Sequence, residues 1–193
     1  MRHSITIGLV IVLAAGIAHA QEAAVTLFGI AIGSKFTPNH DYVFVQENTG
    51  TLYYTLRRVT NTEYLLQGVT VSAASHVVVK VDGRTASGPE NVCHRMIFET
   101  RTQLKTRYPR LKERVDEVDG TAWHLLSMDR PGCFFNETAA GMSLRVPCSS
   151  SFMLHCERLS NAFVIEASDT EYSKQARDEA QTIAHAPKRD HLD

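Results

Sequence analysis

Apolar and polar residues alternate along several short runs of this chain, which predicts strands with one face in a core. The clearest run is Leu52 to Arg58, where Leu52, Tyr54 and Leu56 share one face. Similar runs predict further strands at residues 23–32, 42–46, 66–72, 76–82, 121–127, 142–148, 152–158 and 162–167. Turn-forming residues at 129–132 and 149–151 predict breaks between the later strands.

The hydrophobic period changes from strand-like to helical between Ser87 and Tyr108, which predicts one long helix. Ser87 and Glu90 have the spacing of a capping box, and Pro109 favours an end to the helix. The apolar positions form one stripe, made of Cys93, Met96, Ile97, Leu104 and Tyr108. This stripe is expected to face the core.

Two further segments have helical spacing. The pattern allows a short helix over Arg110 to Val118, and a C-terminal helix from a capping box at Ser168 and Glu171 to about Ala186. Residues 187–193 are expected to be disordered. The chain thus predicts a single α+β domain over residues 21–193, with a mainly antiparallel sheet packed by one long helix at about 88–108 and by the C-terminal helix.

Residues 1–20 have the layout of a secretory signal peptide, with a basic start, a short apolar run and Ala18-His19-Ala20 as a cleavage site. A retained membrane anchor is the alternative, but the apolar run is short for a span. The sequence therefore predicts a periplasmic or secreted protein with no transmembrane span after cleavage. The formal net charge of −1 gives no indication of nucleic-acid binding.

The opening VTLFGIAIG, from Val25 to Gly33, resembles the mature N-terminus of small secreted bacterial proteins of unknown function. In those proteins an LFG-type strand starts the domain and a helix later packs on the sheet. The resemblance implies no activity.

All four cysteines lie in the mature chain, and an even number in an oxidising compartment predicts two disulfides. Three pairings are open. Cys93 lies on the helical stripe, and Cys148 and Cys156 both lie on the apolar face of late strands, so Cys93 could bond to either. We favour Cys93 with Cys156 and Cys133 with Cys148. This choice would brace the helix against the sheet.

Metal binding is the competing role for the cysteines. The adjacent pairs Cys93-His94 and His155-Cys156, with His124, contain suitable donors. Strand alternation places His155 and Cys156 on opposite faces, so we expect no metal site. No cofactor motif is present, and we expect no cofactor.

Catalytic signatures are also missing from the sequence, which has no G-x-S-x-G or S-x-x-K motif. A hydrolase site remains an alternative if a cleft joins a nucleophile or carboxylate to two of four histidines, which are His76, His94, His124 and His155. Glu157 and Glu166 could form a glycosidase pair, but a solvated sheet face is favoured.

Basic residues gather along and just after the long helix, and we predict Arg101, Lys105, Arg107 and Arg110 as candidate partner-binding residues. The sequence thus favours a non-enzymatic binding protein, of the inhibitor or immunity type, that acts on an envelope protein or a toxin. The alternatives are the hydrolase and a carrier of a small ligand between sheet and helix. Oligomeric state is not predicted.

Overall fold

The structure is a computed structural model that describes residues 24–57, 63–139 and 142–185 of the chain. The predicted signal peptide at residues 1–20 and the predicted tail at 187–193 lie outside the described residues.

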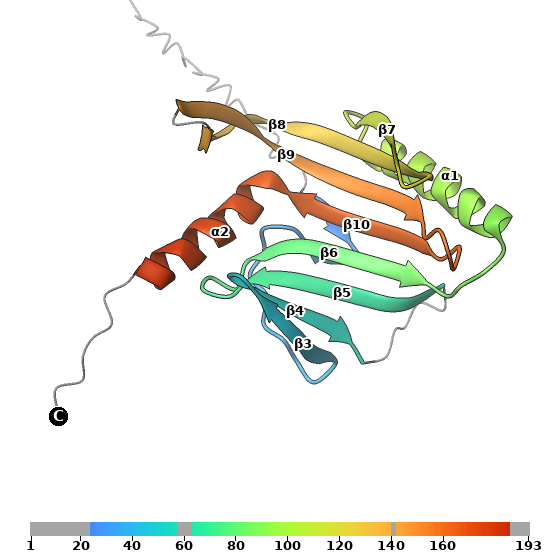
Figure 1. Cartoon of the computed structure of the whole chain (residues 1–193), viewed down its shortest axis with the longest axis horizontal. Helices are drawn as coiled ribbons and strands as arrows, with labels where there is room; N and C mark the ends of the chain where they lie inside the picture. The colour runs from blue at the N-terminus through green and yellow to red at the C-terminus, as the bar shows by residue number, and fades with distance from the viewer. Residues whose placement is uncertain (1–23, 58–62, 140–141, 186–193) are drawn as a thin grey trace, which may run out of the picture.

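The described residues form a large antiparallel sheet and two helices (Figure 1). The strand order in the sheet is β3-β4-β5-β6-β10-β9-β8-β7, and β1 and β2 form a separate small hairpin. This confirms the predicted single α+β domain. The elements are β1 (Thr26–Leu27), β2 (Ile30–Ala31), β3 (Tyr42–Asn48), β4 (Thr51–Leu56), β5 (Tyr64–Ser72), β6 (Val78–Thr85), α1 (Glu90–Arg107), β7 (Lys112–Val118), β8 (Thr121–Ala139), β9 (Met142–Cys156), β10 (Phe163–Asp169) and α2 (Thr170–His185).

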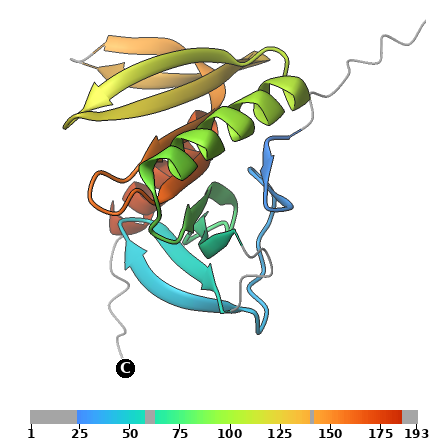
Figure 2. The same cartoon turned by 90° about the vertical axis from the view of Figure 1, so that its right-hand side faces the viewer.

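Helix α1 crosses one face of the sheet and contacts β9 and β10 (Figure 2). Most of its predicted stripe is buried, with Cys93, Ile97 and Leu104 in the core and Tyr108 just beyond the helix, whereas Met96 is only partly buried. Alternate residues of β9 and β10 meet this stripe, and Phe152 and Ile165 are among the most buried of them. Helix and sheet therefore share one core.

Both disulfides pair as predicted. Cys93 of α1 is bonded to Cys156 at the end of β9, and the two Cα atoms are 6.0 Å apart. Cys133 of β8 is bonded to Cys148 of β9, with a Cα–Cα distance of 5.3 Å. The first bond joins the helix to the sheet, whereas the second joins two neighbouring strands.

The helix allowed over Arg110 to Val118 is wrong, because Lys112–Val118 is the edge strand β7. Val115 and Val118 were expected to share a buried helical face, but in the strand they are 53% and 47% exposed. β7 pairs with β8 over its whole length, and this pairing satisfies the backbone N–H and C=O groups of β7 that point towards β8.

Two predicted turns are also wrong, since residues 129–132 lie within β8 and residues 149–151 lie within β9. In β8 the turn residues produce an irregularity in the pairing with β9, between Asp129 and Phe134, instead of a chain reversal. In β9 the serines are satisfied across strands, because the Ser150 hydroxyl donates to the Asp169 carboxylate over 2.6 Å.

The predicted first strand at residues 23–32 is instead the hairpin of β1 and β2. Phe28 and Gly29 form its turn, both with positive φ. Neither capping box forms as predicted. Helix α1 begins after Pro89 without a side-chain cap, and Asp169 caps α2 by accepting a hydrogen bond from the Glu171 amide.

The sheet face opposite the core carries paired charges. Lys80 donates to Glu166 over 3.1 Å, and Arg84 pairs with Glu157 over 2.6 Å. This arrangement fits the solvated sheet face that we favoured for Glu157 and Glu166. Among the described residues, no helix has the length and hydrophobicity needed to cross a membrane.

Candidate functional site

A groove of about 680 Å³ lies between α1 and the N-terminal segment, residues 24–36. Apolar side chains supply the smaller part of its surface, and these are Leu27, Phe28, Val92, Met96, Leu104 and Ile165. Polar side chains add to its walls, among them Thr26, Glu63, Arg95, Glu99, Thr100, Gln103 and Arg107. We call this concave surface the α1 groove.

One wall of the α1 groove comes from the β1–β2 hairpin and from the start of β5. The Phe28 ring lies edge-on to Tyr64, with 4.8 Å between ring centroids. Gly83 makes room for this ring, because a Cβ atom there would lie only 2.4 Å from Phe28 Cζ. Burial, reinforced by the charge of Glu63, raises the pKa of Tyr64 to about 12. The Tyr64 hydroxyl on this wall is therefore uncharged at neutral pH.

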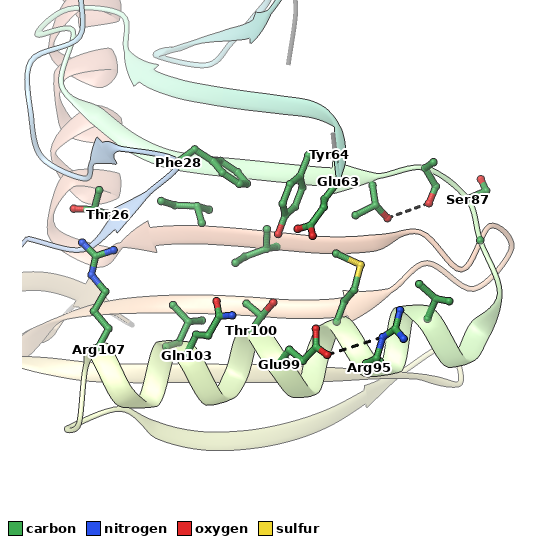
Figure 3. A pocket seen from close by; sticks show the side chains of 18 residues that line it. Thr26, Phe28, Glu63, Tyr64, Ser87, Arg95, Glu99, Thr100, Gln103 and Arg107 are labelled. Carbon is green, nitrogen blue, oxygen red and sulfur yellow. Dashed lines mark hydrogen bonds and ion pairs between the residues drawn. The ribbon is translucent and has the colours of Figure 1, made fainter. Parts of the chain in front are cut away.

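The opposite wall is a second stripe of α1, beside the buried one. Val92, Met96, Thr100, Gln103 and Arg107 recur every three or four residues, which places them along one side of the helix. Figure 3 shows Thr100 and Gln103 facing Phe28 and Tyr64 across the groove. The spacing of this stripe is visible in the sequence, but its mixed polarity resembles an ordinary solvated helix face.

Both walls are fixed by specific bonds. The Cys93–Cys156 disulfide holds α1 to the sheet. At the other end of the helix, the Thr26 amide donates to the Tyr108 hydroxyl over 3.1 Å, which joins the N-terminal segment to the chain just after α1. Figure 3 shows Arg107 at this end, extended towards Thr26. The groove is therefore largely preformed, with a cation at one end.

The structure separates the four predicted partner-binding residues. Arg107 lines the α1 groove, and Arg110 donates to the Asp129 carbonyl over 3.3 Å. Arg101 and Lys105 both donate to the Glu113 carboxylate of β7. These contacts neutralise part of the predicted basic face, and its partner-binding role remains a prediction.

Glu113 is the centre of a charged cluster between α1 and β7. Besides the two basic side chains of α1, His124 of β8 lies 3.0 Å from the Glu113 carboxylate through its Nδ1 atom. Burial alone would raise the pKa of Glu113, but hydrogen bonds from Lys105 and His124 and the charge of Arg101 lower it to about 2. Glu113 is therefore ionised over the usual pH range.

Replacing Glu113 by Gln is expected to lower the free energy of unfolding by about 1–2 kcal/mol at neutral pH, because the charge-assisted hydrogen bonds are lost. Since the folded-state pKa lies below the unfolded value, this contribution is present above about pH 4.3 and is lost as the pH falls towards about 2. Chemical unfolding of both proteins at several pH values measures the difference.

Glu117→Gln is the matched control, because Glu117 is an exposed carboxylate of the same strand. We expect that control to have no measurable effect on stability at any of these pH values. A wild-type advantage over Glu113→Gln that is equally large at about pH 5 and about pH 2 would contradict the assignment.

Two of the four histidines considered for catalysis lie at one small cavity. His94 and His124 line a space of about 180 Å³ together with the carboxylates Glu90 and Glu157. Among the described residues, neither histidine is hydrogen-bonded to a serine, threonine or cysteine side chain. The cavity thus joins two of the four histidines to carboxylates, as a hydrolase site would require. Hydrolase activity itself remains a prediction.

The other two histidines lie elsewhere. His76 occupies a positive-φ position in the β5–β6 connection. His155 stacks on Trp123 with 4.1 Å between ring centroids, on the opposite face from the buried Cys156, as alternation predicts. Burial lowers the pKa of His155, against the charges of Glu157 and Glu166.

Potential metal ligands come together at one place in the described part of the chain, where Cys133, Cys148 and Glu171 approach one another. The two sulfur atoms are bonded to each other in a disulfide and cannot act as thiolate ligands. The donor set therefore does not fit a metal ion.

Comparison with known proteins gave no family for this chain. No protein-family model matches it, and a search of curated proteins found no match.

Proposed function

We propose that this chain is a non-enzymatic binding protein of the periplasm or the extracellular space that holds a small amphipathic ligand in the α1 groove. The supporting observation is the groove itself, whose volume of about 680 Å³ falls in the range of small-molecule sites. Among the functions that the sequence allows, this proposal corresponds to the carrier that binds a small ligand between sheet and helix. A concave site favours it over an inhibitor that acts through a flat basic face.

The chemistry of the groove suggests the ligand class. Phe28, Val92 and Met96 are partly exposed and offer an apolar surface to the body of a ligand. Thr100 and Gln103 can exchange hydrogen bonds with its polar groups. Arg107 offers a guanidinium group at one end, which suits a carboxylate, sulfonate or phosphate. An elongated molecule with an apolar body and an anionic end satisfies all three.

Rigidity of the walls also supports binding. A ligand that enters a preformed site does not have to order the protein, so less free energy of binding is lost. The Cys93–Cys156 disulfide and the Thr26–Tyr108 hydrogen bond supply this rigidity from opposite ends of α1. The disulfides are in addition compatible with an extracellular or periplasmic location, and the predicted signal peptide supports export.

Titration with anilinonaphthalene sulfonate, a fluorescent anionic amphipathic probe, tests the proposal. We expect the wild-type protein to bind it, and Met96→Trp to weaken binding at least about tenfold, because the larger side chain projects into the groove and occupies part of the space for the probe. Phe98→Trp is the matched control, since Phe98 lies on the same helix, is 61% exposed and does not line the groove. Calorimetry with the same probe checks the fluorescence result.

Two results would remove the proposal. One is the absence of probe binding to the folded wild-type protein. The other is equal binding by Met96→Trp and Phe98→Trp, which would place the probe outside the α1 groove. Circular dichroism and thermal unfolding of both variants establish that each is folded before the titrations are compared.

A hydrolase is the second candidate function, and the Glu113–His124 pair favours it. An ionised carboxylate beside Nδ1 can orient a histidine, and His124 lines the small cavity with His94. The pure protein would then hydrolyse ester, amide, glycoside or phosphoester substrates. If it turns over none of these classes, this candidate is removed.

A further inference from the structure

The large sheet has two edge strands, β3 and β7, and their outer edges differ in chemistry. Each pairs with one neighbour, β3 with β4 and β7 with β8. Within the described part of the chain, no strand pairs with the other side of either. An edge of this kind presents backbone N–H and C=O groups that can pair with another strand.

Charged side chains protect β7 against such pairing. Five of its residues are charged, namely Lys112, Glu113, Arg114, Asp116 and Glu117. Charges on an edge strand discourage pairing, because a second strand would have to desolvate them. The β7 edge is therefore protected by its sequence.

Strand β3 lacks this protection. Its one charged residue is Glu47, near the end of the strand, and Val43, Phe44 and Val45 are all exposed apolar side chains. Successive residues of a strand point to opposite faces, so the apolar surface lies on both faces of this edge. Val45 is the extra residue of an irregularity in the pairing with β4, which leaves it without a cross-strand partner. A neighbour that supplied a second uncharged strand would cover both faces.

We propose that the occupant of the β3 edge is β3 of a second copy of this chain, in an antiparallel pair that continues the sheet across a two-fold axis. Two copies could pair through β3 and β7 or through β3 and β3, and the charges of the two strands favour the second arrangement. A β3–β7 pair would bring charged residues against Val43 to Val45. It would also leave β7 of one copy and β3 of the other unpaired, so that further copies could add at both ends and form a filament. A β3–β3 pair places Val43 to Val45 of one copy against the same residues of the other, keeps the two Glu47 residues near opposite ends of the pair, and closes as a dimer.

Sedimentation equilibrium of the exported protein, from about 1 to 200 µM, tests this dimer, since one strand pair gives a small interface and a concentration-dependent association. We expect Val45→Lys to raise the dissociation constant at least about tenfold. Val115→Lys on β7 is the matched control and is expected to leave it unchanged. The two side chains are equally exposed, at 51% for Val45 and 53% for Val115.

A monomer over the whole concentration range would overturn the proposal, and so would a dimer that Val45→Lys does not weaken. Hydrogen exchange of the wild-type protein gives a second measurement that needs no variant. Amides of β3 should exchange more slowly at about 200 µM than at about 1 µM, whereas those of β7 should not change. Equal exchange of β3 at both concentrations would also overturn the dimer. The proposal does not depend on the ligand of the α1 groove.

Discussion

Replacing Phe152 by alanine is expected to lower the free energy of unfolding by about 3–5 kcal/mol. Phe152 is 0% exposed, in the second half of β9, and Leu126 and Ala167 are its cross-strand neighbours on either side. Its ring lies 5.5 Å from that of Tyr108, measured between centroids. The substitution therefore leaves a cavity where the end of α1 meets the sheet.

Denaturant unfolding measures the effect, provided that wild type and variant have the same dependence on denaturant. The control is Phe98→Ala on α1, which removes the same side chain from an exposed position and is expected to cost about 0.5 kcal/mol or less. Comparable losses from the two substitutions would show that Phe152 is not in the core.

Loss of the Cys93–Cys156 disulfide, through Cys93→Ala with Cys156→Ala, is expected to cost about 4 kcal/mol. The bond closes a loop with a sequence separation of 63 residues, so its removal restores much conformational freedom to the unfolded chain. Because the bond also holds α1 in place, the same double variant should bind anilinonaphthalene sulfonate more weakly. Unfolding and titration without reductant measure both effects.

The second disulfide supplies the comparison. Cys133 and Cys148 are separated by only 15 residues, and removal of their bond is expected to cost about 3 kcal/mol. That bond lies away from the α1 groove, so probe binding should be unchanged. A larger loss of stability, or of probe binding, from this second pair would contradict the role given to Cys93–Cys156.

Local sequence was sufficient for the elements whose signals agree over many residues. The buried stripe of α1 could be predicted because its apolar residues keep one period from Cys93 to Tyr108. The faces of the strands also indicated that Cys93 bonds to Cys148 or Cys156, and the favoured partner, Cys156, is the observed one. Both predictions used only periodicity, which is a property of neighbouring residues.

Segments that depend on distant partners were predicted wrongly. Strand β7 carries Glu113 on the side that faces α1, and this carboxylate is satisfied only when Arg101 and Lys105 are brought beside it. Ser150 was assigned to a turn because serine is common there, yet its hydroxyl is satisfied by Asp169 on a neighbouring strand. In both cases a tertiary contact decides the local structure.

The α1 groove could not be predicted for a related reason. Its α1 wall has a helical period that the sequence displays, but the other wall is the β1–β2 hairpin, which was expected to be a single strand. The position of that hairpin depends on Gly83, which admits the Phe28 ring, and on the Tyr108 hydroxyl. No local pattern links these residues.

The covalent bond between α1 and β9 has a consequence for when and where the protein can work. One wall of the α1 groove belongs to the helix that this bond fixes. Thiols stay reduced in the cytoplasm and are oxidised outside it. Under the export and the ligand-binding role that we propose, the wall becomes rigid only outside the cytoplasm, so synthesis of the chain and capture of a ligand take place in different compartments.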